Sequence, residues 1–169
     1  TLSQTINFTR RYTGVSSMAK YFGIDLLVTD VGVAMEIPQE LYTDSMLDDQ
    51  GKIPVKIVNR RIANGTRNLA KEAAMTRGEA VRAILIGLEA AEAMKKAGIQ
   101  LFGVGEMGIG NTTTSSAVLS ALTGAKAEQV VGRGGGLNDE GLAKKIKIVD
   151  DAVNSWCMND PIEKLAKVG

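Results

Sequence analysis

Short apolar runs alternate with helical patterns along this chain, and this alternation restricts its fold more than any other feature. The apolar runs cover Ile24–Val31, Ile53–Val58, Ile99–Val104 and Gln129–Val131. Uninterrupted apolar runs of this kind are typical of strands that are covered on both faces. Strands that alternate with helices are joined by right-handed crossovers into a parallel sheet. The sequence therefore predicts an α/β fold with a mostly parallel sheet between two layers of helices, a three-layer arrangement.

The clearest helical pattern runs from Thr76 to Lys96. Its apolar residues recur at helical spacing, and they are Val81, Ile84, Leu85, Leu88 and Ala91. Thr76 and Glu79 have the spacing of a capping box, and Gly98 follows the last turn, where a left-handed residue commonly ends a helix. The sequence thus predicts both ends of this helix.

Three further helices are expected in the second half of the chain. One follows Asn111 and stops near Gly124, one runs from Asn138 to Trp156, and a short one begins at Asp160-Pro161. Asp before Pro is a favourable helix start, because Asp caps free N–H groups and proline suits the first helical position. The polar segment Leu41–Lys52 is expected to be a solvated loop.

Composition excludes several classes of protein. A length of 169 residues favours one domain, and the formal net charge of +1 with scattered Lys and Arg argues against a nucleic-acid partner. With no histidine and the single cysteine Cys157, disulfides, Cys/His zinc sites and catalytic triads that use imidazole are excluded. The chain lacks a membrane-spanning apolar run and a signal peptide, and we expect a cytoplasmic protein with no membrane partner.

Two glycine-rich loops carry the strongest functional signal. LFGVGEMGIGNTTTSS, residues 101–116, passes from an apolar run through glycines into a helix that opens on Asn111 and Thr112. VVGRGGGLNDEG, residues 130–141, repeats that arrangement. Such junctions direct free backbone N–H groups and the positive end of a helix at an anion, so the loops predict a phosphate site. The alternative is that the glycines only form tight turns.

Two familiar nucleotide motifs fit the first loop incompletely. Gly103, Gly105 and Gly108 satisfy the dinucleotide-binding pattern, but the acidic residue expected after the next strand is missing. The stretch from Gly105 to Thr112 resembles a triphosphate-binding loop, except that Asn111 replaces its lysine. A single phosphate therefore suits the loop better than a dinucleotide or a triphosphate.

Glu106 and Lys145 are the charged candidates beside these loops. A carboxylate near a phosphate is unfavourable unless positive charge develops there, as it does at the oxocarbenium-like carbon of a ribosyl transfer. The alternative for Glu106 is a loop acid that pairs with backbone N–H groups. Lys145 could neutralise the phosphate, although it could also lie on a solvated helix face.

The motifs FGVGEMGIGNTT at 102–113 and VVGRGGGL at 130–137 resemble the nicotinate mononucleotide:dimethylbenzimidazole phosphoribosyltransferases of cobalamin synthesis. VTDVGV at 28–33, RIANGTRNLAKEAAMTRGEA at 61–80 and DPIEKLAKVG at 160–169 support the resemblance in the same order. It implies a Rossmann-like core, a homodimer, and transfer of phosphoribose from nicotinate mononucleotide to a benzimidazole-type base without a metal or other cofactor. The products would be alpha-ribazole 5′-phosphate and nicotinate.

The resemblance also assigns residues to roles. It makes Glu106 the catalytic loop glutamate, and with the loop pattern it gives a phosphate and ribose site of Gly105, Gly108, Gly110, Asn111, Thr112, Gly134, Gly135, Gly136 and Lys145. Base recognition is expected from Thr9, Tyr12, Thr13 and Tyr21. Arg11, Tyr12 and Tyr21 depart from the family pattern, which leaves another benzimidazole, a purine or a phenol as possible bases.

Family members are about twice as long as this chain, so residues 1–169 are expected to be a single α/β core truncated at both ends relative to the family. The glutamate that receives the proton of the attacking base belongs to the carboxyl-terminal part of the family. Two functions stay open: an enzyme for phosphoribosyl transfer, and a noncatalytic nucleotide-binding fragment or subunit that lacks this general base.

Overall fold

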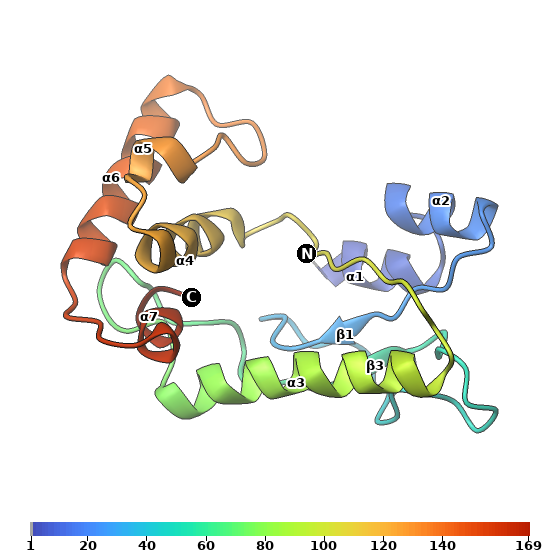
Figure 1. Ribbon diagram of the computed structural model, residues 1–169. Coiled ribbons are helices and arrows are strands. Elements are labelled where there is room, and N and C mark those ends of the chain that lie inside the picture. Colours follow the sequence, from blue (N-terminus) through green and yellow to red (C-terminus); the bar gives the residue numbers. More distant parts are fainter. Residues whose placement is uncertain (1) are drawn as a thin grey trace. The chain divides into compact units, whose positions relative to one another are not determined.

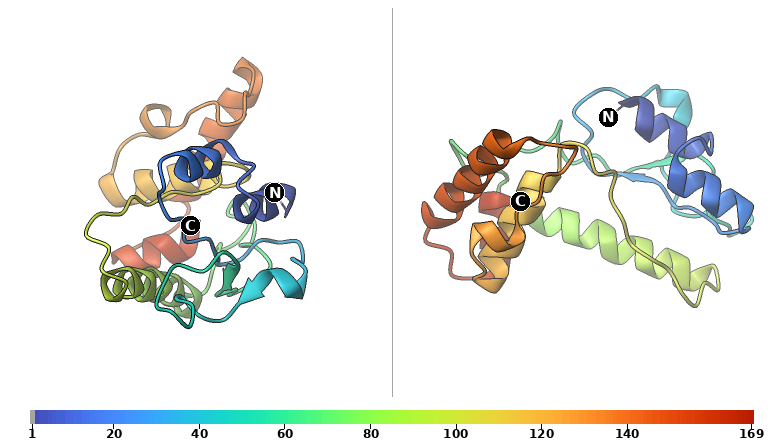
Figure 2. Two further views of the ribbon diagram at one scale, coloured as in Figure 1. Left: turned by 90° about the vertical axis from the view of Figure 1, so that its right-hand side faces the viewer. Right: turned by 90° about the horizontal axis from the view of Figure 1, so that it is seen from above.

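The computed structural model describes residues 2–169, and the chain forms two compact units (Figure 1). Unit 1 contains the residues up to Gly65 together with Ala83–Met107, and unit 2 contains Thr66–Arg82 and Gly108–Gly169. The boundary falls inside helix α3, Arg77–Lys96, which is continuous and is seen nearly end-on in the left view of Figure 2.

Unit 1 holds a small parallel sheet and two amino-terminal helices. Its elements before α3 are α1 (Leu2–Thr9), α2 (Gly14–Tyr21), β1 (Thr29–Asp30), the 3-10 helix η1 (Gln39–Leu41), β2 (Tyr42–Thr43) and β3 (Ile57–Asn59). The strand order is β1-β3-β2, with both pairs parallel. Thr29 pairs with Val58, and Tyr42 pairs with Ile57.

The core of unit 1 is built around β3. Ile57 and Val58 are fully buried, and they alternate between two clusters because successive strand residues point to opposite faces. Val58 packs with Met46, Ile86 and Ala93, of which the last two come from α3. The sheet is therefore covered by α3 on the Val58 face.

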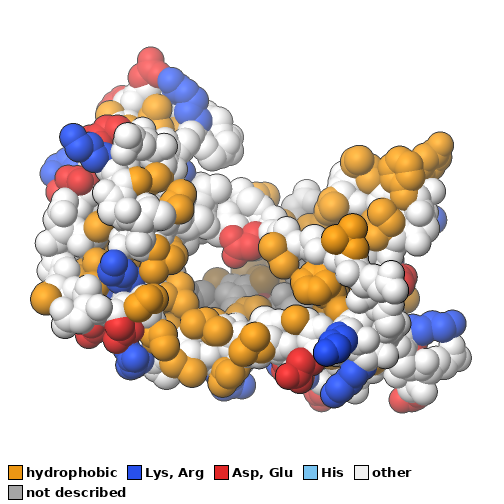
Figure 3. Space-filling model, viewed as in Figure 1, with side chains coloured by type: hydrophobic (Ala, Val, Ile, Leu, Met, Phe, Trp, Pro, Cys, Tyr) orange, Lys and Arg blue, Asp and Glu red, His pale blue; other side chains and the backbone are white. Residues whose placement is uncertain are grey.

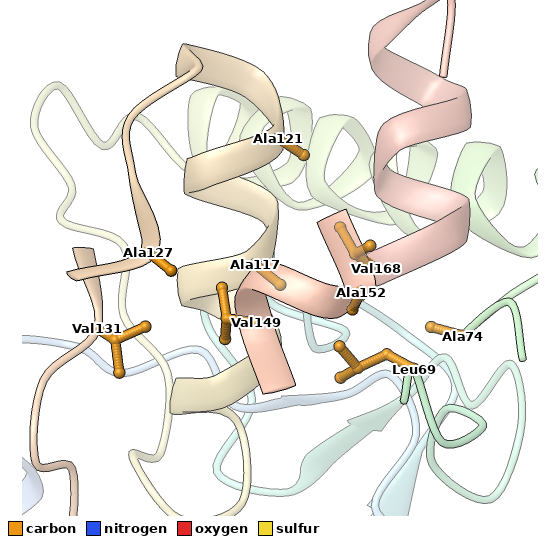
Figure 4. Close-up of a cluster of buried hydrophobic side chains, with 9 residues drawn as sticks. All are labelled: Leu69, Ala74, Ala117, Ala121, Ala127, Val131, Val149, Ala152 and Val168. Atoms are coloured by element: carbon orange, nitrogen blue, oxygen red, sulfur yellow. The ribbon is translucent and has the colours of Figure 1, made fainter. Parts of the chain in front are cut away.

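Unit 2 is helical and has a core made of small side chains. Its helices are α4 (Thr112–Thr123), α5 (Ala127–Val130), α6 (Asp139–Asn154) and α7 (Pro161–Val168), with the start of α3. Figure 4 shows the buried cluster, which comprises Leu69, Ala74, Ala117, Ala121, Ala127, Val131, Val149, Ala152 and Val168. Four of the five alanines lie on α4, α5 and α6, so these helices can approach one another closely.

The predicted helix ends are confirmed. The Thr76 N–H donates to Glu79 at 2.6 Å and the Glu79 N–H donates to the Thr76 hydroxyl at 3.2 Å, which completes the capping box. Gly98 has a φ of 77°. Asn138 caps α6, and Asp160 caps α7 with proline in its first turn.

Two of the four expected strands are absent from the described residues. Residues 99–104 are not in a strand and are mostly exposed, since no strand in residues 2–169 pairs with them and a ladder requires a partner. Residues 129–131 were expected to be a strand, but α5 occupies Ala127–Val130. The Gln129 side chain accepts a hydrogen bond from the Lys126 N–H at 3.1 Å, which favours the helical turn.

The sequence prediction was also wrong in one further place. The segment Leu41–Lys52, expected to be solvated, contains β2 and buries Tyr42 and Met46. On α3 the residues that face the core of unit 1 are Ile86 and Ala93, whereas Ile84, Leu85 and Leu88 are exposed. The helical spacing of the apolar residues therefore predicted the helix but not which of its faces is buried. Helices α1 and α2 had not been predicted.

Replacing Thr76 with alanine should destabilise the protein by about 1 kcal/mol, because the N–H of Glu79 loses its acceptor at the start of α3. Chemical denaturation measures the change in the free energy of unfolding. Thr76→Ser is the control, since it keeps the hydroxyl and should retain most of the stability. Equal losses in both variants would contradict a capping role.

Candidate functional site

Unit 2 brings the two glycine loops together around one lysine. The Lys145 Nζ donates to the hydroxyl of Thr112, at the start of α4, over 2.9 Å. The same ammonium donates to the carbonyl oxygen of Gly132, in the second loop, over 3.0 Å. A Cβ on Gly134 would lie 2.8 Å from the Thr112 Oγ1 and 3.5 Å from the Lys145 Nζ. Thr112, Gly134 and Lys145 are therefore neighbours.

Lys145 is only 6% exposed, so the alternative of a solvated helix face is wrong for this residue. Its neighbours Lys144 and Lys147 are exposed. An ammonium group has three hydrogens to donate, and within residues 2–169 two are used by Thr112 and Gly132. A buried cation with one remaining donor can hold an anion.

Backbone N–H groups border the same place. The first N–H groups of α4 have no acceptor within the helix, and Gly110, just before it, has a φ of 81°. In the second loop the N–H of Gly136 donates to the Arg133 carbonyl oxygen at 3.2 Å and is therefore occupied. The N–H groups of Gly134 and Gly135 donate no hydrogen bond to any part of the chain that the structure describes.

Arg133 is a contributor that sequence reasoning missed. Its Nη1 donates to the Leu137 carbonyl oxygen at 2.9 Å, and its Nη2 contacts the carboxylate of Asp139 at 2.5 Å. Asn138 caps α6 between them by accepting from the Gly141 N–H at 2.8 Å. These contacts hold the second loop to the start of α6. In the sequence, the position of Arg133 among four glycines could have indicated this role.

The remaining predicted loop residues lie along one stretch of chain. Gly105 and Glu106 are exposed members of unit 1, whereas Gly108, Gly110 and Asn111 belong to unit 2 and precede α4 directly. No Cβ clash would arise at Gly105, Gly108 or Gly110. These glycines are therefore not required by close packing within the protein.

The predicted base-binding residues lie in and around α1 and α2 of unit 1. The Thr13 hydroxyl caps α2 by accepting a hydrogen bond from the Ser16 N–H at 3.2 Å. The Thr9 hydroxyl donates to the Ile6 carbonyl oxygen at 2.8 Å. Tyr12 and Tyr21 are 76% and 84% exposed. Figure 3 shows hydrophobic side chains gathered over α2. Both threonines thus have local structural roles, and both tyrosines are open to contact.

Unit 1 also contains a buried carboxylate that the sequence analysis did not single out. Asp30, at the end of β1, is 2% exposed and accepts hydrogen bonds from the N–H groups of Gly32 at 2.9 Å and Val33 at 2.8 Å. The Tyr42 hydroxyl donates to the same carboxylate. Burial, and then the hydrogen bond to Asp30, raises the pKa of Tyr42 to about 12.

This pKa shift predicts a loss of stability at high pH. Because the raised pKa means that the folded state favours the protonated phenol, the Tyr42 contribution is complete below pH 10 and is lost as the pH rises through about 12. We expect the melting temperature of the wild type to exceed that of Tyr42→Phe at pH 8, and the difference to shrink between pH 10 and 12. A difference that is constant over this range would contradict the assignment.

Within residues 2–169 no three His, Cys, Asp or Glu side chains come together in a group that could hold a metal ion. Of the helices described in this range, none combines the length and apolarity needed to cross a membrane.

Comparisons with known proteins agree on one family. A family model described as "Phosphoribosyltransferase" matches residues 1–169. A nicotinate-nucleotide–dimethylbenzimidazole phosphoribosyltransferase from Clostridium perfringens is 44% identical over 100% of this chain and 43% of its own length. The protein of the same name from Acetivibrio thermocellus is 46% identical over 98% of this chain and 43% of its own length.

A solved structure gives the same result. The crystal structure of CobT from Thermus thermophilus superimposes with a TM-score of 0.84 and 37% sequence identity. The match covers 99% of this chain and 46% of that chain. The chain therefore spans less than half the length of the relatives that it matches.

Proposed function

Because this chain belongs to the family of nicotinate-nucleotide–dimethylbenzimidazole phosphoribosyltransferases, we propose that it forms the phosphate-binding part of an enzyme of that activity. The enzyme transfers phosphoribose from nicotinate mononucleotide to a benzimidazole-type base and yields alpha-ribazole 5′-phosphate and nicotinate for cobalamin biosynthesis. The observation that supports this function best is the buried Lys145, which joins the two glycine loops.

The 5′-phosphate is bound between the loops in this proposal. The third hydrogen of the Lys145 ammonium and the N–H groups of Gly134 and Gly135 supply donors, and the amino end of α4 supplies further N–H groups. The positive charge of Lys145 is held in place before the substrate arrives, so little entropy is lost when the phosphate binds. This arrangement fits a monoester better than a triphosphate, because the described site has one lysine.

The chemical step is an in-line displacement at C1′ of the ribose. A ring nitrogen of the base forms a bond to C1′ while the bond from C1′ to the pyridinium nitrogen breaks, and that electron pair returns to the nicotinate ring. Nicotinate leaves without needing an acid, and the configuration at C1′ inverts. The benzimidazole N–H proton passes to a base, which we assign to the part of the family's length outside this chain. We assign Glu106 to the sugar, where its charge stabilises the oxocarbenium-like carbon.

Several finer features belong to this proposal. The two units are parts of one Rossmann-like, three-layer α/β core, and the complete enzyme is a cytoplasmic homodimer that needs no metal or cofactor. The base is recognised by Thr9, Tyr12, Thr13 and Tyr21. Because Tyr12 and Tyr21 depart from the family pattern, we expect the accepted base to be a different benzimidazole, a purine or a phenol, and strict preference for dimethylbenzimidazole across a panel of bases would refute this.

A second function is favoured by one observation, namely that the donors gathered around Lys145 can bind a phosphate without taking part in proton transfer. It is a noncatalytic nucleotide-binding fragment or subunit. Incubating the purified chain with nicotinate mononucleotide and, in parallel, with dimethylbenzimidazole, another benzimidazole, a purine and a phenol separates the two. Formation of alpha-ribazole 5′-phosphate, or of the corresponding product of another base, rules out the binding-only function. Binding of nicotinate mononucleotide by calorimetry without turnover rules out catalysis by this chain alone, and absence of binding contradicts both.

A further inference from the structure

Ser116 is a buried polar residue of α4 to which the proposed phosphate site assigns no role. It is 8% exposed, and its hydroxyl group lies within hydrogen-bonding distance of two carbonyl oxygens, that of Thr112 at 2.9 Å and that of Val130 at 3.1 Å. Thr112 is one turn earlier on the same helix, whereas Val130 ends α5 just before the second glycine loop. The Thr112 carbonyl alone would satisfy the single hydrogen of the hydroxyl. The contact with Val130 therefore indicates a role between elements and not only within α4.

The Val130 carbonyl oxygen needs a donor from outside its own helix. The last four carbonyl groups of a helix have no partner within it, and α5 has only four residues. The next residue, Val131, is extended with a φ of −87° and a ψ of 121°, and its side chain lies in the core of unit 2. A carbonyl group beside the core is costly to leave unpaired. The Ser116 hydroxyl thus fixes the point at which the chain leaves α5 and enters the loop.

A second contact attaches the same segment two residues further along. The Gly132 carbonyl oxygen accepts from the Lys145 ammonium, which also donates to the Thr112 hydroxyl. The base of the loop is therefore held to the first turn of α4 on both sides of the buried Val131. Lys145 is itself a donor of the proposed phosphate site, whereas the hydroxyl of Ser116 is engaged with backbone oxygens. Ser116 can therefore keep the loop in place while Lys145 binds the anion.

We propose that Ser116 is a positioning residue for the phosphate site. Its hydrogen bond to Val130 sets the separation between the second glycine loop and the start of α4, and it thereby directs the N–H groups of Gly134 and Gly135 toward the phosphate. These N–H groups are held in place before the ligand arrives, so less conformational freedom is lost on binding. The inference rests on the proposed function, because it assigns a role within that same site.

The test measures the binding of inorganic phosphate to the full chain by calorimetry. Ser116→Ala should weaken the affinity about five- to tenfold, the effect of one ordinary hydrogen bond. Ser116→Cys keeps a side chain of similar shape but has only a weak donor, so it should weaken binding in the same direction. It carries the test if the alanine variant does not fold.

Two serines of the same helix provide matched controls. Ser120 is 5% exposed, and its hydroxyl donates to the Ala125 carbonyl oxygen at 2.7 Å, outside both glycine loops. Ser115 donates to the Asn111 carbonyl oxygen at 2.9 Å, at the start of α4. Ser120→Ala reproduces the loss of a buried hydrogen bond, and Ser115→Ala reproduces the loss of a hydroxyl from the first turn. Both variants should bind phosphate as the wild type does.

Nuclear magnetic resonance reports the position of the loop without ligand. The N–H signals of Gly134 and Gly135 should shift in Ser116→Ala and stay in place in Ser120→Ala, a difference that a loss of stability alone does not produce. Unchanged signals in Ser116→Ala, or phosphate affinity equal to that of either control, would overturn the role of Ser116 alone. A wild-type chain that does not bind phosphate would contradict the proposed function and this role together.

Discussion

Lys145→Met is expected to weaken the binding of inorganic phosphate and of nicotinate mononucleotide by roughly 10- to 100-fold, equivalent to about 1.5–3 kcal/mol for hydrogen bonds to a charged group. The methionine keeps the length of the side chain, but it removes the ammonium that donates to Thr112 and Gly132. The Gly132 carbonyl oxygen then loses its donor, so the second loop is also held less firmly. Isothermal titration calorimetry measures the change in affinity.

The control for net charge is Lys144→Met on the same helix. Lys144 is exposed, so its loss changes the charge of the protein by the same amount without changing the site. We expect Lys144→Met to bind phosphate as the wild type does. If both variants lose affinity equally, the effect is long-range electrostatics and Lys145 has no specific role.

Gly134→Ala should reduce stability by about 2–4 kcal/mol, because two costs add at one position. The residue has a φ of +56°, a left-handed conformation that is unfavourable for alanine. Its new Cβ would also lie 2.8 Å from the Thr112 Oγ1, so the threonine or the loop must move. That movement should weaken phosphate binding as well. Thermal unfolding and calorimetry measure the two effects.

Two variants separate these costs. Gly135→Ala is the matched control, since the structure has nothing within 4 Å of its Cβ position and its φ is not in the left-handed region. The double variant Gly134→Ala with Thr112→Ala removes the close contact but keeps the backbone strain, so it should regain part of the stability. If Gly134→Ala is as stable as Gly135→Ala, the close approach of the two loops is wrong.

The residues that end helices were predictable from sequence, since their effects are local. Thr76 with Glu79, Gly98, Asn138 and Asp160 act on N–H or C=O groups within four residues of their own positions. Local hydrogen bonding therefore fixed these boundaries without knowledge of the rest of the fold. The same reasoning located the two glycine loops, because a helix begins just after each of them.

Features that depend on distant partners were not predictable in the same way. The run 99–104 has the composition of a strand, but a strand also requires a neighbour, and composition does not report whether one is present. The stripe on α3 has apolar residues on more than one side, so periodicity could not choose between Ile84 and Ile86. The burial of Lys145 was not predictable from sequence either, because its two acceptors lie 33 and 13 residues away in the chain.

The alanine-rich contact between α4 and α6 has a consequence for how the site can change. Lys145 and Val149 are one turn apart on α6, and Thr112 begins the helix that carries Ala117. Ala117 and Val149 are both fully buried, so there is no space between the helices for an extra methylene group (Figure 4). The separation of the lysine from the threonine is thus set by side chains that never meet a substrate. Random mutagenesis should therefore find variants with weakened phosphate binding at Ala117 as readily as in the loops.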